Sequence, residues 1–178
     1  GFRKGEILGL EWDDIDFENQ VISINRTSIY SKEKGTITGT PKTENGYRSL
    51  KLNDEVINAI RELKEEQDKN ISKLGDAWHN TNRLFTAWNG LPMGPDTPRH
   101  WLQKFCQAEG IRYVNVHSFR HFNATALIEF NCNVNQVSAS LGHSDPTTTL
   151  NIYAHVFAKV QAKASEALSN SISINVSG

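Results

Sequence analysis

Two side chains suited to phosphate chemistry, His117 and Arg120, stand three residues apart. In a helix this spacing places both on the same face. The arginine fork can bind two non-bridging phosphate oxygens, and a neutral imidazole beside it can accept a proton. The pattern is short, however, and the same two side chains could simply pair on a helix surface. A functional interpretation therefore needs further residues to converge on this pair.

More reactive side chains lie further along the chain. His143 follows Leu141 and Gly142, and Tyr153 comes ten residues after His143. They add a second imidazole and a phenol to the C-terminal half. Nineteen Lys and Arg against 20 Asp and Glu give a net charge of −1, whereas nucleic-acid-binding domains are usually basic. Any phosphate site must therefore be local.

Helices are expected to position most of these residues. In the segment 117–130 the stripe expected to be buried consists of Phe119, Phe122, Ala126, Leu127 and Phe130. Periodicity and capping signals predict helices over 4–12, from Asn53 past Leu63, from Thr97 with Pro98 in the first turn to Gly110, over 117–130 and 133–140, and from Pro146 towards Leu168.

Alternating apolar and polar residues predict a small antiparallel sheet of three strands, at 21–26, 36–40 and 48–52. Lys34-Gly35 and Asn45-Gly46 are the expected turns, and the second is a strong hairpin signal. The tail, residues 171–178, alternates in the same way and predicts one further strand that needs an edge to join.

The composition fits a single globular domain. The chain has 178 residues, 38% of them hydrophobic, with a mean hydropathy of −0.50. No apolar run approaches the ~18 residues of a membrane span, and no signal peptide pattern is present, which favours a cytoplasmic location. The two cysteines, Cys106 and Cys132, form no disulfide framework or zinc ligand set. The abrupt start without Met indicates a fragment of a longer protein.

Four sequence motifs together resemble the tyrosine recombinases, the integrases of phages and transposons. GFRKGEILGLEWDDID, HSFRH and LGHSDPTTTLNIYAH resemble the three signature boxes of that family, and PKTENGYRSLKL resembles its lysine hairpin. The motifs occur in order from Gly1 to about Ala167. The resemblance implies an α+β, mostly helical catalytic domain over 1–178 with a small three-stranded antiparallel sheet, from which the family's N-terminal core-binding domain is absent.

The resemblance also implies a set of catalytic residues. Tyr153 would attack the scissile phosphorus and form a 3′-phosphotyrosine, with no ATP or metal cofactor. Two arginines would stabilise the phosphorane, His117 would take or orient the phenolic proton, and His143 would donate to a phosphate oxygen. The matched positions are Arg3, Lys42, His117, Arg120, His143 and Tyr153, with Lys42 as the acid for the 5′-oxygen and Glu6 in a supporting role.

Each of these residues also has an ordinary structural interpretation when it is taken singly. Arg3 and Glu6 could form a solvated ion pair, and Tyr153 could be a core tyrosine. The functional interpretation is favoured because all the positions match one mechanism in order. His121 is left out of the catalytic set, since its helical angle differs from that of His117 by roughly 40° and a local hydrogen bond would explain it.

The resemblance implies duplex DNA attachment sites as the target of a site-specific recombinase. Local DNA contacts are expected from Lys4, Lys32, Lys34 and Arg48. Self-association as a tetramer on DNA, with exchange of the C-terminal segment, is the expected assembly. Accessory DNA-bending or excision proteins are further expected partners, in a bacterial cytoplasm at the nucleoid, and no membrane is expected to take part.

Three alternatives remain open at this point. A type IB topoisomerase-like activity shares the phosphotyrosine chemistry but relaxes DNA instead of exchanging strands. A catalytically silent DNA-binding module would keep the fold without the reaction. A metal-dependent nuclease is disfavoured, because the sequence lacks the closely spaced carboxylates that would hold magnesium.

Overall fold

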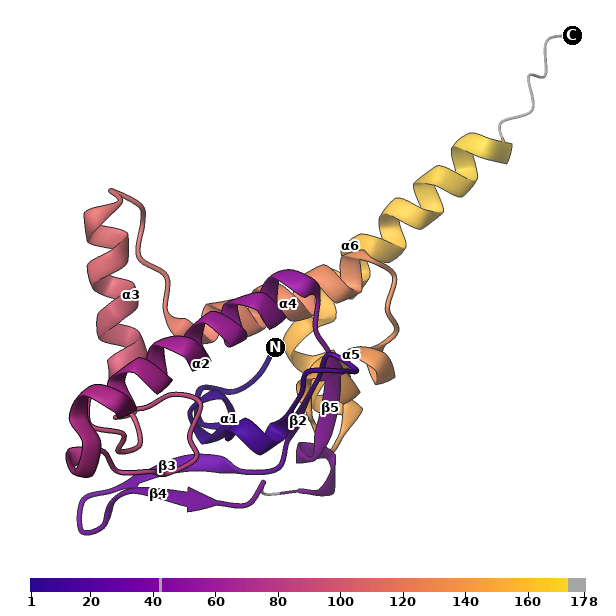
Figure 1. The fold of residues 1–178 in the computed structure, drawn as a ribbon. Helices are drawn as coiled ribbons and strands as arrows, with labels where there is room; N and C mark the ends of the chain where they lie inside the picture. Colours follow the sequence, from indigo (N-terminus) through magenta and orange to yellow (C-terminus); the bar gives the residue numbers. More distant parts are fainter. Residues whose placement is uncertain (42, 173–178) are drawn as a thin grey trace, which may run out of the picture.

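The computed structural model describes residues 1–41 and 43–172. Helices dominate this part of the chain, and two small antiparallel sheets accompany them (Figure 1). The predicted class, a mostly helical α+β domain, is confirmed. The elements are α1 (Lys4–Gly9), η1 (Trp12–Asp14), β1 (Ile15–Asp16), β2 (Val21–Ile24), β3 (Thr27–Ser31), β4 (Gly35–Gly39), η2 (Glu44–Gly46), β5 (Arg48–Lys51), α2 (Asp54–Leu74), η3 (Gly75–Ala77), α3 (Thr97–Ala108), α4 (Val116–Glu129), α5 (Val134–Leu141) and α6 (Pro146–Ile172).

The three-stranded sheet has the order β1-β2-β5 and is antiparallel. Its strands β2 and β5 correspond to the predicted runs 21–26 and 48–52. The prediction that 36–40 is its third strand is wrong, because β4 pairs with β3 in a separate two-stranded ribbon. Asn45-Gly46 accordingly forms part of the 3₁₀ turn η2, which leads into β5, and not a two-residue hairpin.

The ribbon leaves the sheet because it packs on α1. Gly9 approaches β3 so closely that a Cβ there would lie 3.0 Å from the Thr27 Cα. The buried Arg83 donates hydrogen bonds to the Gly9 carbonyl and to the Thr38 hydroxyl, and so joins the end of α1 to β4. Side-chain contacts between distant segments therefore decide the strand pairing.

One hydrophobic core forms between α2 and the three-stranded sheet. Asn53 caps α2 as predicted, accepting a hydrogen bond from the Val56 amide at 3.1 Å. Ile57 and Ile60 are buried against residues of β2, among them Ile24. Leu10, which directly follows α1, belongs to this core, so the core anchors the segment that contains α1.

A second core forms among α4, α5 and α6. The residues of α4 that face it are Arg120, Ala124 and Ile128, which lie four apart on one helical row. The predicted buried stripe is therefore wrong for its three phenylalanines: Phe119, Phe122 and Phe130 are 54%, 73% and 82% exposed. The small Ala124 allows close helix packing, and the row that it belongs to brings the Arg120 guanidinium inward.

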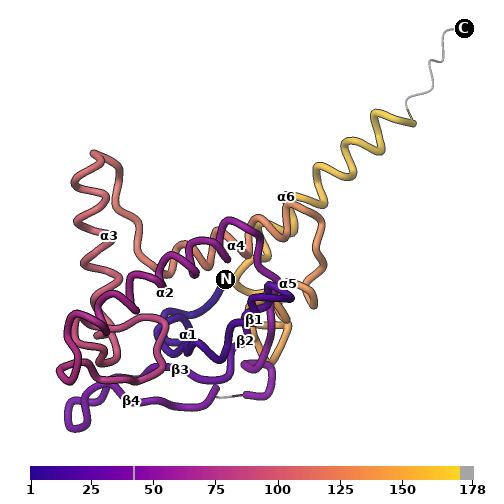
Figure 2. The backbone as a smooth tube through the Cα atoms, viewed as in Figure 1, coloured from indigo at the N-terminus to yellow at the C-terminus, as the bar shows by residue number. Residues whose placement is uncertain are grey.

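Helix α6 begins in this core and then extends away from the body of the molecule (Figures 1 and 2). Its buried residues, Thr149, Tyr153 and Val156, all lie in its first three turns. The predicted strand at 171–178 is wrong at its start, since Ser171 and Ile172 belong to α6. Residues 173–178 lie outside the described part of the chain.

Helix α3 contacts α4 and lies on the side of the molecule remote from the far end of α6 (Figure 1). Its N-cap is Asp96, so Thr97 is the first helical residue and not the predicted cap, while Pro98 occupies the first turn as predicted. Gly110, with φ of +65°, follows its end. Among residues 1–41 and 43–172, no helix is long and apolar enough to cross a membrane.

Candidate active site

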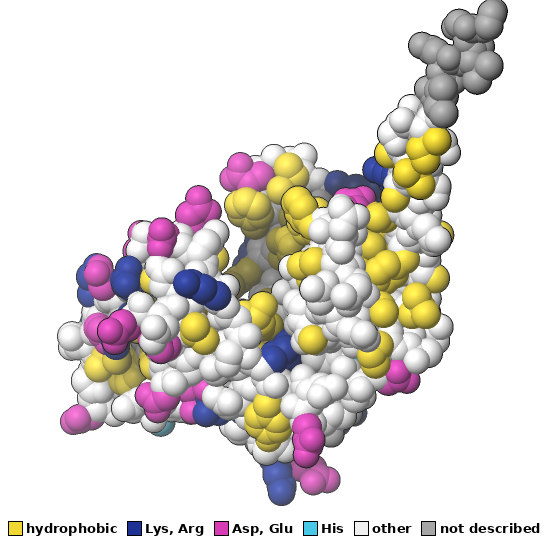
Figure 3. Space-filling view, turned by 90° about the vertical axis from the view of Figure 1, so that its right-hand side faces the viewer, with side chains coloured by type: hydrophobic (Ala, Val, Ile, Leu, Met, Phe, Trp, Pro, Cys, Tyr) yellow, Lys and Arg dark blue, Asp and Glu magenta, His cyan; other side chains and the backbone are white. Residues whose placement is uncertain are grey.

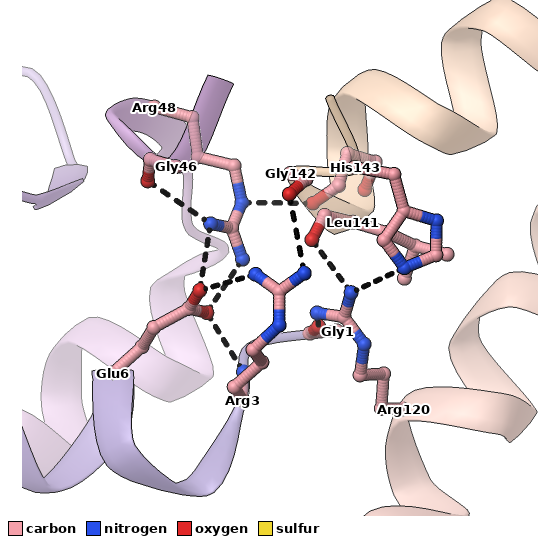
Figure 4. Close-up of polar contacts among 10 residues, drawn as sticks. Gly1, Arg3, Glu6, Gly46, Arg48, Arg120, Leu141, Gly142 and His143 are labelled. Atoms are coloured by element: carbon pink, nitrogen blue, oxygen red, sulfur yellow. Dashed lines mark hydrogen bonds and ion pairs between the residues drawn. The ribbon is translucent and has the colours of Figure 1, made fainter. Parts of the chain in front are cut away.

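Arg3 lies at the N-cap of α1 and is fixed there by Glu6. The Arg3 amide donates to Glu6 Oε2 at 2.7 Å, and the Arg3 guanidinium donates to Glu6 Oε1 at 2.8 Å. The Arg3 side chain is still 44% exposed, whereas that of Glu6 is 5% exposed. Glu6 therefore holds a partly free arginine at the surface of the site (Figure 4).

Arg48 binds Glu6 from the opposite side. Its Nη2 donates to Glu6 Oε2 at 2.8 Å, and the two side chains are 8% and 5% exposed. Burial alone would raise the pKa of the Glu6 carboxyl, but hydrogen bonds from Arg48 and Arg3 outweigh it and lower this pKa. Arg48 was expected to contact DNA. Its enclosed ion pair instead makes it part of the frame that holds Arg3.

The C-terminal end of α5 joins three arginines from different parts of the chain (Figure 4). Arg48 Nε donates to the carbonyl of Ser140 at 3.0 Å, and Arg120 Nη2 donates to that of Leu141 at 2.7 Å. Arg3 Nη2 donates to the next carbonyl, at residue 142, at 3.2 Å. Carbonyls at a helix C-terminus lack intrahelical partners and carry partial negative charge, so they attract cations.

Gly142 makes this junction possible. It caps α5 in the left-handed conformation, with φ of +66°. A Cβ at Gly142 would lie 2.7 Å from Arg48 Nη1 and 3.0 Å from the Asn45 carbonyl oxygen. Both the backbone conformation and the available space therefore require glycine at this position.

Arg120 is the most enclosed of the cations that face the site. It donates to the Gly1 carbonyl at 2.6 Å, and its Nη2 approaches His143 Nε2 at 3.0 Å. Burial, followed by the charge of Arg3, lowers the pKa of Arg120 to about 10. It stays cationic at neutral pH and adds its charge to that of Arg3.

His143 is held in one neutral form by its two neighbours. Arginine can only donate, so His143 Nε2 accepts from Arg120, and Nδ1–H donates to Thr149 Oγ1 at 2.8 Å. Burial, then the charges of Arg120 and Arg3, lower the pKa of His143 to about 4. Thr149 is fully buried at the start of α6, which fixes the imidazole orientation.

This low pKa makes the free energy of unfolding depend on pH. An unfolded histidine titrates near 6.5, so between about pH 6.5 and 4 the unfolded chain binds more protons at residue 143 than the folded chain. Stability is therefore expected to fall as the pH decreases through this window. In thermal unfolding, the melting temperature should fall less between pH 6.5 and 4 for His143→Asn than for the wild type. His155→Asn, at an exposed position, should follow the wild type. Parallel curves for all three would contradict the assignment.

A pocket of about 510 Å³ opens beside these groups. Arg3, Glu6 and His143 line one part of it, and residues of the ribbon, of η2 and of the first turn of α6 line other parts. Pro41 and Thr43 are also in the lining. Lys42, the predicted acid, lies outside the described residues, so its side chain stays a prediction.

Tyr153 is not among the residues that line this pocket. The residue is 4% exposed, and its hydroxyl makes a 2.8 Å hydrogen bond with His121 Nδ1. Burial raises the pKa of the Tyr153 phenol, and the charge of Arg120 opposes this effect. Another group must therefore accept the phenolic proton if Tyr153 is to react at neutral pH.

The described contacts of His117 are with His121, the hydrogen-bond partner of Tyr153, and do not include the phenol itself. Its ring meets that of His121 edge to face, with centroids 4.7 Å apart. Partial burial, then the charges of His121 and Arg120, lower the pKa of His117. The prediction that left His121 out of the site thus missed the direct partner of Tyr153. The signal was the i, i+4 spacing of His117 and His121, which places both on one helical face.

The other predicted DNA contacts are exposed lysines. Lys4 lies on α1, and Lys32 and Lys34 lie at the turn between β3 and β4. Across the part of the chain that the structure describes, no group of three or more His, Cys, Asp or Glu side chains could hold a metal ion.

The fold agrees with the comparisons to known proteins. A family model described as the phage integrase family matches residues 1–159. The chain is 33% identical to a tyrosine recombinase XerC-like protein of Caldanaerobacter subterraneus subsp. tengcongensis, over 96% of this chain and 46% of that protein. It is 26% identical to the ICEBs1 integrase of Bacillus subtilis, over 94% of this chain and 45% of that protein.

Solved structures show the same similarity. The Tn1549 transposon integrase in complex with transposon right end DNA superposes with a TM-score of 0.73 at 27% identity, covering 94% of this chain and 55% of that one. The fold and the family model point to one family. The chain belongs to the phage integrase family, and it spans about half the length of the curated relatives that it matches.

Proposed function

We propose that the chain is the catalytic domain, over residues 1–178, of a site-specific recombinase or integrase that cleaves and rejoins duplex DNA. The observation that carries the proposal is the convergence of Arg3 and Arg120, far apart in sequence, on successive carbonyls at the end of α5. His143 contacts Arg120 and lines the pocket together with Arg3. Tyr153 lies within the electrostatic influence of Arg120. We propose that this arrangement is a phosphate clamp with a nucleophile beside it.

The proposed reaction exchanges one phosphodiester for another. The Tyr153 oxygen attacks the scissile phosphorus, the bond to the 5′-oxygen breaks, and Lys42 supplies the proton that the 5′-oxygen takes. Arg3 and Arg120 stabilise the additional negative charge of the phosphorane. Rejoining reverses these steps, with a 5′-hydroxyl attacking the phosphotyrosine. The energy of the bond is retained, so no ATP is required.

Phosphate binding changes the protonation of His143. In the free protein its Nε2 accepts from Arg120 and has no proton to give. Burial is the main cause of the low His143 pKa, and a bound phosphate competes for the Arg120 donors and offsets the positive charges that lower this pKa further. His143 can then gain a proton and donate it to a phosphate oxygen, as the proposed role requires.

The test uses a DNA substrate nicked close to the cleavage site, so that the short 5′-hydroxyl fragment diffuses away and rejoining is blocked. A covalent protein–DNA band on a denaturing gel is expected for the wild type and not for Tyr153→Phe. The band should persist in EDTA. Relaxation of supercoiled DNA without exchange between sites would favour the topoisomerase-like alternative, and DNA binding without a band would favour the silent module.

Lysines at the ribbon turn are proposed to contact the DNA backbone. Lys32 and Lys34 are exposed there, and each phosphate contact contributes about 0.9 to the slope of log affinity against log salt concentration. The double variant Lys32→Ala, Lys34→Ala is expected to reduce this slope by about 2. Lys69→Ala, on the exposed side of α2, serves as the control. Equal slopes for all three proteins would contradict the contact.

The proposed assembly is a tetramer on two duplex attachment sites, with exchange of C-terminal segments. The far part of α6 extends beyond the core, and Figure 3 shows hydrophobic side chains along this rising part of the helix. Leu168 and Ile172 are 59% and 60% exposed there. A neighbouring subunit would cover them. Accessory DNA-bending or excision proteins complete the proposed complex. Because its substrate is DNA, the complex is proposed to act on the nucleoid in the bacterial cytoplasm.

A further inference from the structure

We propose that His121 accepts the phenolic proton of Tyr153 when the tyrosine attacks DNA. The inference deepens the proposed function and rests on it. It assigns the proton acceptor to a residue that the sequence motifs alone do not single out, in place of His117. The evidence is the geometry around the phenol, the position of α4 relative to α6, and the occupied nitrogens of the competing histidine.

The phenol and His121 form a directed hydrogen bond. The Tyr153 oxygen and His121 Nδ1 are 2.8 Å apart, which is within the range required of a general base. A phenol is protonated at neutral pH, so its O–H donates and Nδ1 accepts. This fixes the imidazole in the form that carries its proton on Nε2. His121 is itself exposed, so the proton that it takes can pass to water.

The other histidines near the site are less suited to this role. His117 touches the His121 ring by an edge-to-face contact, and its described contacts include no polar bond to the phenol. His143 uses one nitrogen for Arg120 and the other for Thr149. Of these imidazoles, His121 is the one with a nitrogen directed at the nucleophile.

The position of His121 also suits the transition state. It follows Arg120 in α4, and Arg120 acts electrostatically on Tyr153. In the proposed reaction the phosphate held by Arg120 is attacked by the Tyr153 oxygen, which lies 2.8 Å from His121 Nδ1. As the new P–O bond forms, the proton moves from the Tyr153 oxygen to His121 Nδ1. The resulting imidazolium is next to the anionic phosphorane. When rejoining releases the tyrosine oxygen from phosphorus, the imidazolium returns the proton to that oxygen.

Two substitutions separate proton acceptance from simple positioning. In His121→Asn the amide oxygen takes the place of Nδ1, so the hydrogen bond is kept but the proton cannot be held. In His121→Leu both are lost. General-base catalysis contributes about 10² to 10⁴-fold, so single-turnover cleavage of the nicked substrate should slow by at least about 100-fold in both variants. His155→Asn, at an exposed position two residues past Tyr153, should cleave at the wild-type rate.

A second substrate distinguishes His121 from the acid of the reaction. A 5′-bridging phosphorothiolate has a leaving group that needs no proton. It should restore cleavage by Lys42→Ala but not by His121→Asn. Nitrogen NMR of labelled histidine provides a readout without DNA: His121 Nδ1 should be unprotonated in the wild type, and its signal should shift in Tyr153→Phe.

The outcomes separate the inference from the proposed function. If the wild type forms the covalent band and His121→Asn forms it equally fast, His121 is not the proton acceptor. Faster cleavage by His121→Asn or His121→Leu would likewise overturn the inference, because the histidine would then restrain the nucleophile. If the wild type itself forms no band while binding DNA, the proposed function fails and the inference fails with it.

Discussion

Arg120→Lys is expected to slow covalent complex formation by roughly 10² to 10³-fold, the usual effect of removing a preorganised donor to a developing negative charge. Lysine retains the charge, but it lacks the planar fork that can bind two phosphate oxygens at once. In the free protein one end of this fork, Nη1, reaches the Gly1 carbonyl, and the other end, Nη2, reaches the Leu141 carbonyl and His143 Nε2. A single ammonium cannot occupy both ends, so the donors around His143 are also rearranged.

The measurement for Arg120 is the single-turnover rate on a nicked substrate at saturating protein. Non-covalent DNA affinity, measured separately, should change much less than the rate. Lys159→Arg on the exposed side of α6 is the matched control, and it should leave the rate unchanged. A lysine variant that cleaves within a few-fold of the wild type would show that Arg120 acts only as a point charge.

Arg48→Met is expected to lower the free energy of unfolding by about 3 kcal/mol, since breaking one side of a buried ion pair leaves the other charge uncompensated. Glu6 and Arg48 are almost fully enclosed, and Arg48 also binds the Ser140 carbonyl. Arg3 alone would then hold the Glu6 carboxylate. The loss should be evident in urea unfolding at neutral pH, and cleavage should fall as well, because Arg3 loses its support.

A second substitution tests whether the uncompensated charge is the cause. In Glu6→Gln, Arg48→Met the carboxylate is gone, so the double variant should be more stable than the sum of the two single losses indicates. Arg61→Met, at an exposed position on α2, should stay within about 0.5 kcal/mol of the wild type. Additive losses in the double variant would contradict the buried pair.

Local signals predicted much of this structure. The Asn53 cap, the glycine that ends α5 and the helix containing His117 and Arg120 all follow from short-range preferences. The placement of Arg3, Arg120 and His143 near one another was also expected. It was implied by the family resemblance, because residues 3 and 120 have no local connection that a pattern could show.

The errors arise where distant contacts decide the outcome. The apolar stripe of α4 was assigned by hydrophobicity, yet Arg120 faces inward because the end of α5 offers it carbonyls, and Phe122 faces outward. Arg48 was expected to contact DNA, but it forms an enclosed ion pair with Glu6, which lies 42 residues away in sequence. The role of His121 depends on α6 packing against α4, which no local spacing specifies.

The most direct measurement of the central claim locates the covalent bond itself. The trapped protein–DNA complex is digested with nuclease and protease, and the modified peptide is sequenced by tandem mass spectrometry. We expect a nucleotide linked through its 3′-phosphate to the Tyr153 oxygen. A nucleotide on any other residue, or a 5′-linked phosphate, would contradict the mechanism that the site geometry supports.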